Sequence, residues 1–246
     1  MTDTEKLAEI LSKSSSAVFF GGAGMSTESG IPDFRSASGI YNQKLNQTFS
    51  PEEMASHRFF LTHPEEFFAF YRARFVYLDA KPNAGHIALA ELERRGVLSA
   101  VVTQNIDGLH QLAGSKVVYE LHGSIRRSYC VQCGAKYDVN FILNNVPIPH
   151  CEHCGGVVKP DVVLYGESLD DATISNAIRA IAAADTLIVG GTSLIVYPAA
   201  GLIDYFRGRH LILINKTATR ADSDAELVIR ENIGATLSRA VKEAFG

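Results

Sequence analysis

The sequence predicts an α/β protein in which a doubly wound parallel sheet stands beside a smaller domain. Three observations predict this class. Six short apolar runs alternate with helical patterns along most of the chain, and a Gly-x-Gly turn follows the first run. Two segments interrupt the alternation: one is rich in Phe and Tyr, and the other holds all four cysteines of the chain.

The six runs have the length and the β-branched and aromatic composition of strands that are buried on both faces. They comprise residues 17–21 (AVFFG), 98–105 (LSAVVTQN), 116–123 (KVVYELHG), 185–191 (DTLIVGG), 210–215 (HLILIN) and 225–229 (AELVI). Parallel strands need crossover connections, which are usually helices. The alternation of strand and helix therefore predicts a Rossmann-like sheet.

Helical patterns occupy the intervals between these runs. Residues 83–96 (NAGHIALAELERRG) end at Gly96, as a helix with a glycine C-cap does. Their apolar face is predicted to contain Ile87, Leu89, Ala90 and Leu92. Residues 171–185 and 234–245 repeat the pattern, and residues 1–16 predict a short amphipathic helix.

The cysteines form two matched Cys-x2-Cys-Gly units, made of Cys130, Cys133, Cys151 and Cys154. Four thiolates brought together in this way form a closed tetrahedral zinc site; four unrelated buried cysteines are the alternative. A closed site leaves no position for a substrate, so the zinc is expected to hold the smaller domain folded and to take no part in a reaction. His122, which precedes the first pair, is therefore not expected to be a ligand, and His150 and His153 beside the second pair are expected to be solvated.

The two interrupting segments define the smaller domain. Residues 36–81 and 124–159 are assigned to a small helical and zinc-binding domain, in which a helical insertion packs with a zinc ribbon. Residues 1–35, 82–123 and 160–246 are assigned to the Rossmann-like domain. No low-complexity linker is visible, so short crossings are expected to join the two domains.

Composition excludes several functions. The chain has 246 residues, 46% of them hydrophobic and 20% charged, which is enough to bury a full core. A formal net charge of -4 provides no global basic field, so no direct binding to nucleic acid is expected. The N-terminal residues lack the apolar core of a secretory signal, and no run reaches the roughly 18 apolar residues of a membrane span, so we expect a cytoplasmic protein. In that reducing compartment a disulfide framework is not expected.

The first glycine turn indicates phosphate binding. Gly22, Ala23 and Gly24 directly follow a predicted strand, where small residues let backbone amides approach a pyrophosphate at a helix N-terminus. Thr27 occupies the third glycine position of the dinucleotide fingerprint, and the expected acidic residue further on is missing, so an ordinary hydride-transfer enzyme is not predicted. The alternative is a glycine turn that serves only strand–helix packing. The following GIPDFR could form a loop that folds over a bound nucleotide.

Polar side chains follow two neighbouring strands. Gln104, Asn105 and Asp107 stand at the carboxyl end of one strand, and His122 stands at the end of the next. Open α/β sheets bind ligands at this edge, so amide, carboxylate and imidazole are expected to face one crevice. Asp107 has a simpler alternative role, which is to cap the helix that follows it.

The ordered motifs GAGMSTESGIPDFR, TQNID, LHG, the paired cysteines, PDVVLYGE, GTSLIVYPAA and LILIN resemble the sirtuins, bacterial type, which are NAD-dependent protein lysine deacylases. The resemblance runs through essentially the whole chain. It implies that the NAD phosphates and ribose contact Gly22, Ala23, Gly24, Thr27, Asp33, Phe34 and Arg35. It implies a nicotinamide pocket of Gln104, Asn105, Ile106 and Asp107, and it makes His122 a further contact of NAD. It implies an adenosine side of Gly191, Thr192, Ser193, Asn215, Lys216 and Ile233.

The resemblance also implies a substrate and a reaction. An acylated-lysine peptide would lie as an extra strand between two edges made of Val163, Leu164, Tyr165, Gly166, Glu167 and Val196. In the family reaction the acyl oxygen attacks C1′ of the nicotinamide ribose, nicotinamide leaves, and the ribose 2′-hydroxyl then attacks the acyl carbon. His122 would be the base, Asn105 would orient a hydroxyl or water, and Asp107 would hold the carboxamide. Water would finally release deacylated lysine and O-acetyl-ADP-ribose, so the products would be these two and nicotinamide.

Three alternatives remain open from the sequence. Tyr71 and Arg74 have the spacing of a pair that binds succinyl or malonyl carboxylates in some sirtuins, which would indicate a desuccinylase or demalonylase. A mono-ADP-ribosyltransferase would use the same cleavage of NAD with another acceptor. A zinc-ribbon binding module without enzymatic activity would leave the polar strand ends unexplained. Oligomeric state has no signal in the sequence.

Overall fold

The computed structural model describes residues 1–34, 39 and 48–246. Within these residues, six parallel strands form one sheet in the order β3-β2-β1-β7-β8-β9. They are β1 (Ala17–Gly21), β2 (Leu98–Thr103), β3 (Val118–Glu120), β7 (Thr186–Gly190), β8 (His210–Ile214) and β9 (Leu227–Ile229). Every strand lies within one of the six predicted runs, and the predicted doubly wound parallel sheet is confirmed.

The order of the strands places a crevice at the middle of the sheet. From β1 the chain moves outward through β2 and β3 on one side, and later through β7, β8 and β9 on the other. β1 and β7 pair in register from Ala17 opposite Thr186 to Gly21 opposite Gly190. Their carboxyl ends therefore meet at the point where the winding reverses, which is where open α/β sheets bind ligands.

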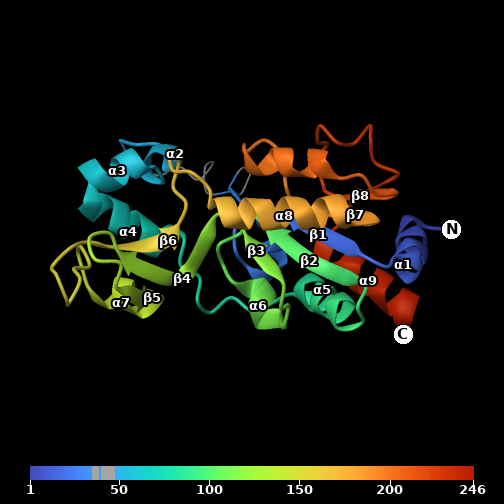
Figure 1. Cartoon of the computed structure of the whole chain (residues 1–246), viewed down its shortest axis with the longest axis horizontal. Helices are drawn as coiled ribbons and strands as arrows, with labels where there is room; N and C mark the ends of the chain where they lie inside the picture. Colours follow the sequence, from blue (N-terminus) through green and yellow to red (C-terminus); the bar gives the residue numbers. More distant parts are fainter. Residues whose placement is uncertain (35–38, 40–47) are drawn as a thin grey trace.

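Helices cover both faces of this sheet (Figure 1). One face is covered by α1 (Asp3–Lys13), α5 (Ala84–Arg94) and α9 (Ile233–Phe245). The other is covered by α8 (Asp171–Ala183) and the 3₁₀ helix η4 (Ala199–Tyr205). Because side chains alternate along a strand, Phe19 packs into the first layer while Val18 and Phe20 pack into the second. A short helix, α6 (Leu109–Ala113), follows β2.

The buried face of α5 differs from the predicted one. Leu89 is fully buried, but Ile87 is 57% exposed, so its assignment to the apolar face was wrong. Residues two positions apart lie on nearly opposite sides of a helix, so Ile87 points away from Leu89. Ala88, Leu89 and Leu92 pack into the apolar layer beneath the helix. The predicted end is close: the helix ends at Arg94, and Gly96 has a φ of +78° just beyond it.

A second, antiparallel sheet of three strands has the order β5-β4-β6 and lies at the other end of the molecule (Figure 1). Its strands are β4 (Gly123–Cys130), β5 (Lys136–Asp138) and β6 (Val158–Val162), with α7 (Val139–Asn144) beside them. Three helices from the earlier segment are α2 (Pro51–Met54), α3 (His57–Thr62) and α4 (Pro64–Arg74). Phenylalanines of α3 and α4 share one apolar cluster with Ile125 of β4 and Val158 of β6. The predicted boundary between residues 159 and 160 falls inside β6.

The chain crosses from the large sheet to the small one at Leu121–Gly123. The Leu121 amide still donates to the Thr103 carbonyl at 2.9 Å, and β4 begins two residues later. Gly123 has a φ of +74°, and a Cβ there would come within 2.0 Å of the Asp161 carbonyl oxygen. Only glycine fits this crossing, so His122 is held between the two sheets.

No helix in the described part of the chain combines the length and the apolar character that crossing a bilayer requires.

The two faces of α5 make a direct test of the packing. We expect Leu89→Ala to lower the free energy of unfolding by about 2–5 kcal/mol, because it leaves a cavity in a fully buried layer. Ile87→Ala, on the exposed side of the same helix, should change it by no more than about 0.5 kcal/mol. Urea denaturation of both variants measures the difference; equal losses would contradict the assignment of the buried face.

Candidate active site

A cavity of about 750 Å³ lies at the carboxyl ends of the parallel strands and extends toward the small sheet. Its walls include every predicted cofactor and substrate residue that the structure describes: Gly22, Ala23, Gly24, Thr27, Asp33, Phe34, Gln104, Asn105, Ile106, Asp107, His122, Val163, Leu164, Tyr165, Gly166, Glu167, Gly191, Thr192, Ser193, Val196, Asn215, Lys216 and Ile233. Arg35 lies outside the described residues. The cysteine cluster is not part of the lining.

The glycine turn after β1 packs directly on the turn after β7. The Gly24 amide donates to the Gly191 carbonyl at 2.8 Å, and a Cβ at Gly24 would lie 2.7 Å from the Gly191 Cα. The predicted α-helix does not follow this turn. Two three-residue 3₁₀ helices stand there, η1 (Ala23–Met25) and η2 (Thr27–Ser29). The glycines thus allow close packing of the two turns that follow β1 and β7, and they also form one wall of the cavity.

Three polar side chains of the cavity wall are linked by hydrogen bonds. Asn105 Nδ2 donates to Ser26 Oγ at 3.0 Å, and Ser26 Oγ donates to Asp107 Oδ2 at 2.7 Å. All three residues are buried. Ser26 was not singled out from the sequence, although it lies within the GAGMSTESG motif. It joins the turn after β1 to the loop after β2, so these two strand ends act as one unit.

Asp107 has two functions at once. Its Oδ1 accepts a hydrogen bond from the Leu109 amide at 2.8 Å, so it satisfies a donor at the start of α6, and its carboxyl group also lines the cavity. Burial raises the pKa of Asp107, while the Leu109 amide, Ser26 and the charge of Arg126 oppose that rise. These partners stabilise the carboxylate in a site that would otherwise favour its neutral form.

The ring of His122 has one defined tautomer. Its Nδ1 lies 2.9 Å from the Gln104 carbonyl oxygen, which can only accept, so the proton is on Nδ1 and Nε2 carries the lone pair. Burial lowers the pKa of His122, and the bond to Gln104 opposes that change only in part. His122 is therefore neutral near pH 7 and able to accept a proton at Nε2.

A second polar network joins the ends of β2, β7 and β8. Gln104 Nε2 donates to Thr192 Oγ1 at 3.0 Å. The Thr192 amide donates to Asn215 Oδ1 at 3.0 Å, and Asn215 Nδ2 returns a hydrogen bond to the Thr192 carbonyl at the same distance. Lys216 follows on the cavity wall. The residues predicted for the nicotinamide and adenosine sides are thus parts of one continuous framework.

The N-terminus of α9 completes the far wall of the cavity. Ile233, its first residue, is buried and lines the cavity. The Gly234 amide donates to Glu28 Oε1 at 2.7 Å across a separation of 206 residues. Glu28 satisfies an amide that Asn232 at the N-cap leaves without a side-chain partner. No local pattern marked Glu28, because its partner comes from the other end of the chain.

The predicted peptide-binding edge runs from β6 into the cavity. The Val163 amide donates to the His122 carbonyl at 3.0 Å. The Tyr165 amide donates to the Ala55 carbonyl at 3.1 Å, and the Tyr165 carbonyl accepts from the His57 amide at 2.9 Å. Among the described residues, the backbone of Gly166 makes no hydrogen bond. The edge is thus fixed on both sides while Gly166 stays accessible.

The four cysteine sulfurs lie within 4.8 Å of one another. Cys130 Sγ is 3.4 Å from Cys154 Sγ, and Cys133 Sγ is 3.6 Å from Cys151 Sγ. The sulfurs of a tetrahedral zinc site with bonds of about 2.3 Å are about 3.8 Å apart, so the cluster fits a structural Zn²⁺. Beside it, Tyr137 Oη lies 3.1 Å from Cys151 Sγ, and His150 Nδ1 lies 3.0 Å from the Gly155 carbonyl.

Tyr71 and Arg74 are not brought together on the cavity wall. Arg74 lines the cavity. Tyr71 is fully buried, with its ring packed on Phe67 and Phe75, and its hydroxyl has no hydrogen-bond partner among the described residues. The geometry gives Tyr71 a role in the core of the smaller domain and not in the pocket.

The comparisons with known proteins all match this chain to members of one family. A model of the Sir2 family matches residues 22–198. A protein of Clostridium perfringens (strain 13 / Type A) named NAD-dependent protein deacetylase is 63% identical over 237 residues, which are 96% of this chain and 97% of that protein. A structure of a Sir2 variant with deacetylated p53 peptide and 3′-O-acetyl ADP ribose has a TM-score of 0.90 at 38% identity, with 98% of each chain covered. A structure of Sir2 with p53 peptide and NAD+ has a TM-score of 0.86 at 40% identity, with 99% of this chain and 98% of that chain covered.

The geometry of the four cysteines predicts that the protein contains zinc. We expect the protein to hold about one zinc per chain. Cys151→Ser should lose the zinc and lower Tm, because the metal holds the ends of the small sheet together. Elemental mass spectrometry and thermal denaturation measure both effects. His153→Ala is the matched control and should keep its zinc; loss of zinc in this variant would make histidine a ligand.

The burial and the hydrogen bond of His122 lead to a prediction about its pKa and its tautomer. Because burial disfavours the imidazolium, the midpoint should lie below the ordinary histidine value of about 6.5. Above that midpoint the neutral ring should carry its proton on Nδ1. Nitrogen-detected NMR of the free protein measures both the midpoint and the tautomer, with the His122→Ala spectrum identifying the signal. A midpoint above 6.5, or a proton on Nε2, would contradict the geometry.

Proposed function

The chain belongs to the Sir2 family, and we propose that it is an NAD-dependent protein lysine deacetylase that releases nicotinamide, deacetylated lysine and O-acetyl-ADP-ribose. One observation carries the proposal above all. His122, with its free lone pair, stands in the same cavity as the Ser26-linked Asn105 and Asp107 and beside the Val163–Gly166 edge. A base, a polar pocket and an edge for a peptide are the parts that such a transfer requires.

NAD fits the continuous framework at the strand ends. The turn after β1 offers the phosphates a wall of small residues, Gly22, Ala23 and Gly24, and Gly191 lies close to this turn. Asn215 and Lys216 lie at the end of β8, on the adenosine side. When bound, NAD supplies the electrophilic ribose carbon to which the acyl oxygen is transferred.

His122 acts as the general base. Its Nε2 accepts a proton from a ribose hydroxyl, while its Nδ1 keeps its own proton and donates a hydrogen bond to the Gln104 carbonyl throughout. A base that starts neutral is available at pH 7, because burial already disfavours the protonated ring. Zinc takes no part in this step, since its four thiolate ligands stand apart from the cavity.

Asn105 and Asp107 hold the nicotinamide end. Asp107 presents a carboxylate to the carboxamide, and Ser26 keeps that carboxylate oriented. Asn105 is oriented through the same hydroxyl, so its remaining amide oxygen can bind a ribose hydroxyl or a water. The three side chains therefore fix one orientation of the leaving group.

The substrate peptide adds a strand between two edges. Gly166 keeps its backbone groups available on one edge, and Val196 lines the cavity on the other. Pairing through backbone groups reads little of the peptide sequence, so one enzyme can accept several proteins. Val163 packs against the sheet side and Leu164 against the small domain, so the acyl-lysine would enter at their junction.

The acyl group proposed is acetyl. A succinyl or malonyl carboxylate would need Tyr71 and Arg74 at one pocket, but the Tyr71 hydroxyl is buried in the aromatic core. We also propose a cytoplasmic location, which is supported by four cysteines in thiol form within a metal-type cluster.

The function is tested with acetyl-lysine and succinyl-lysine peptides, with and without NAD. The wild type should deacetylate the first peptide only when NAD is present, release one nicotinamide per turnover, and act much more slowly on the second. His122→Ala should lower kcat by about 10²–10⁴-fold, because the base is lost. Mass spectrometry of the peptide and of O-acetyl-ADP-ribose gives both rates.

The control for this variant is its fold. His122→Ala should keep its zinc and the wild-type Tm, since the ring makes one hydrogen bond at the cavity edge. Turnover like that of the wild type would contradict the role of His122. Nicotinamide release without deacetylated peptide would favour ADP-ribosyl transfer instead.

A further inference from the structure

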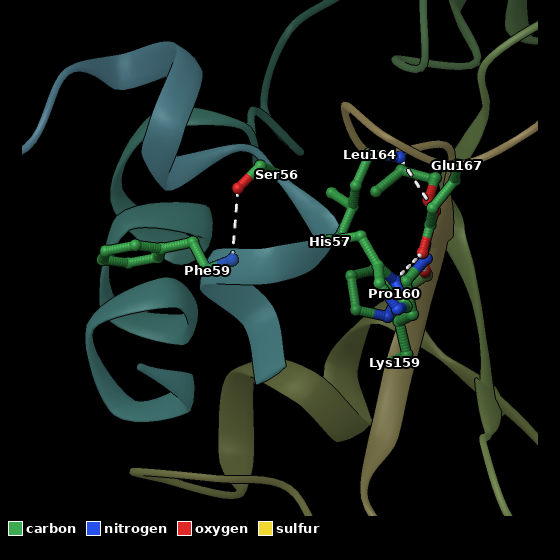
Figure 2. Close-up of polar contacts among 8 residues, drawn as sticks. Ser56, His57, Phe59, Lys159, Pro160, Leu164 and Glu167 are labelled. Atoms are coloured by element: carbon green, nitrogen blue, oxygen red, sulfur yellow. Dashed lines mark hydrogen bonds and ion pairs between the residues drawn. The ribbon is translucent and has the colours of Figure 1, made fainter. Parts of the chain in front are cut away.

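A cluster of charged and polar side chains lies beside the peptide-binding edge, and two of its three residues have no role in the proposed reaction (Figure 2). It consists of Lys159 on β6, Glu167 after the edge, and His57 at the first position of α3. Glu167 stands between the other two: its Oε2 is 3.0 Å from Lys159 Nζ, and its Oε1 is 2.7 Å from His57 Nδ1. The resemblance places Glu167 at the substrate but gives no role to Lys159 or His57.

Lys159 is a buried cation with its donors occupied. Its side chain is 4% exposed. Besides Glu167, Nζ donates to the Val162 carbonyl at 2.8 Å and to the Pro160 carbonyl at 3.4 Å. Burial lowers the pKa of Lys159, and the charge of Glu167 opposes that change. Burying an ammonium group without acceptors would lower stability, so Lys159 Nζ must keep these three acceptors close to it. The backbone at Pro160 and Val162 and the carboxylate of Glu167 are therefore held around Nζ.

Glu167 closes the edge into a turn. Its Oε2 also accepts from the Leu164 amide at 2.8 Å, and its own amide donates to the Leu164 carbonyl at 2.9 Å. Burial raises the pKa of Glu167, but the Leu164 amide, Lys159 and His57 together lower it. The carboxylate is thus charged and fully engaged, and its engagement defines the path of Leu164–Gly166.

His57 holds the same turn from the helical segment. Ser56 caps α3, with its Oγ accepting from the Phe59 amide at 3.1 Å, so the position of His57 is fixed (Figure 2). The His57 amide donates to the Tyr165 carbonyl while its ring donates to Glu167. His57 therefore makes two hydrogen bonds to this region. One goes to the backbone of the edge at Tyr165, and the other goes to the carboxylate of Glu167.

We infer that Lys159, Glu167 and His57 are positioning residues for the peptide, which hold the Val163–Gly166 edge in the shape that an acyl-lysine strand pairs with. The inference rests on the proposed function. The cluster contacts this edge and the α2–α3 turn, whereas the residues proposed for NAD lie on the strand ends of the large sheet. Loss of the cluster should therefore weaken peptide binding and spare NAD binding.

The test compares steady-state constants for an acetyl-lysine peptide and for NAD. His57→Ala should raise the peptide KM about two- to tenfold, because a hydrogen bond to a charged group is lost. Its kcat and its KM for NAD should stay within about twofold of the wild type. His57→Gln keeps an N–H donor and should restore most of the peptide KM. Lys159→Met should have a larger effect than His57→Ala, since it leaves Glu167 without its cation.

The chain offers a matched control in a second histidine–carboxylate pair. His210 Nδ1 lies 2.6 Å from Glu226 Oε2, on β8 and away from the cavity lining. His210→Ala should leave the peptide KM unchanged. Zinc content and Tm are measured for each variant; if Lys159→Met fails to fold, the partly exposed His57 decides the question, since its side chain is 44% exposed.

Two outcomes would overturn the inference. One is a wild-type peptide KM in His57→Ala, and the other is an equal change in the KM for NAD. Failure of the proposed function is distinguishable, because it would show as no NAD-dependent turnover in the wild type. In that case the Kd of the labelled acetyl-lysine peptide, measured by fluorescence anisotropy in wild type and His57→Ala, still tests the cluster.

Discussion

The contact on which the site depends most is the one between the glycine turns after β1 and β7. The two strands pair in register to their last residues, and the Gly24 amide then bonds the Gly191 carbonyl. Side chains at these turns would separate them, since a Cβ at Gly24 would lie 2.7 Å from the Gly191 Cα. Beside this contact Ser26 donates to Asp107 and Gln104 donates to Thr192, so the ends of four strands share two polar networks.

The second constraint is the crossing at Gly123. Because the chain leaves β3 and enters β4 within three residues, the catalytic candidate and the small domain have no flexible linker between them. The His122 carbonyl accepts from the Val163 amide while its ring bonds the Gln104 carbonyl. One residue thus connects the peptide edge to the polar pocket. A Zn²⁺ held by the four cysteines would act on this geometry only indirectly, by joining the segments next to the ends of β4 and β6 that pair at Cys130 and Val158.

The parts of the molecule that were predictable from sequence are those with a local signal. Buried strands can be recognised from their apolar and β-branched composition, and the Cys-x2-Cys pairs can be recognised from their spacing. The sequence also located the strand ends, and from them it predicted that Asn105, Asp107 and His122 face one crevice. In the structure all three residues line one cavity. Three errors or omissions have long-range or geometric causes. Ile87 was counted on the wrong side of a helix, the helix after Gly24 is a 3₁₀ turn, and Glu28 meets an amide from the opposite end of the chain.

Burial acts on both titratable groups of the pocket, and its effects explain where their hydrogen bonds lie. Removal from water favours the neutral form of each group, so it lowers the pKa of His122 and raises that of Asp107. For the base proposed at His122 this effect is useful, and one backbone carbonyl orients the ring. For the carboxylate proposed to bind the nicotinamide at Asp107 it is unfavourable. Asp107 accordingly receives donors on both oxygens, and Arg126 adds a positive charge nearby. The asymmetry of the polar contacts thus follows from the different charge states proposed for the two side chains, a neutral imidazole at His122 and a negative carboxylate at Asp107.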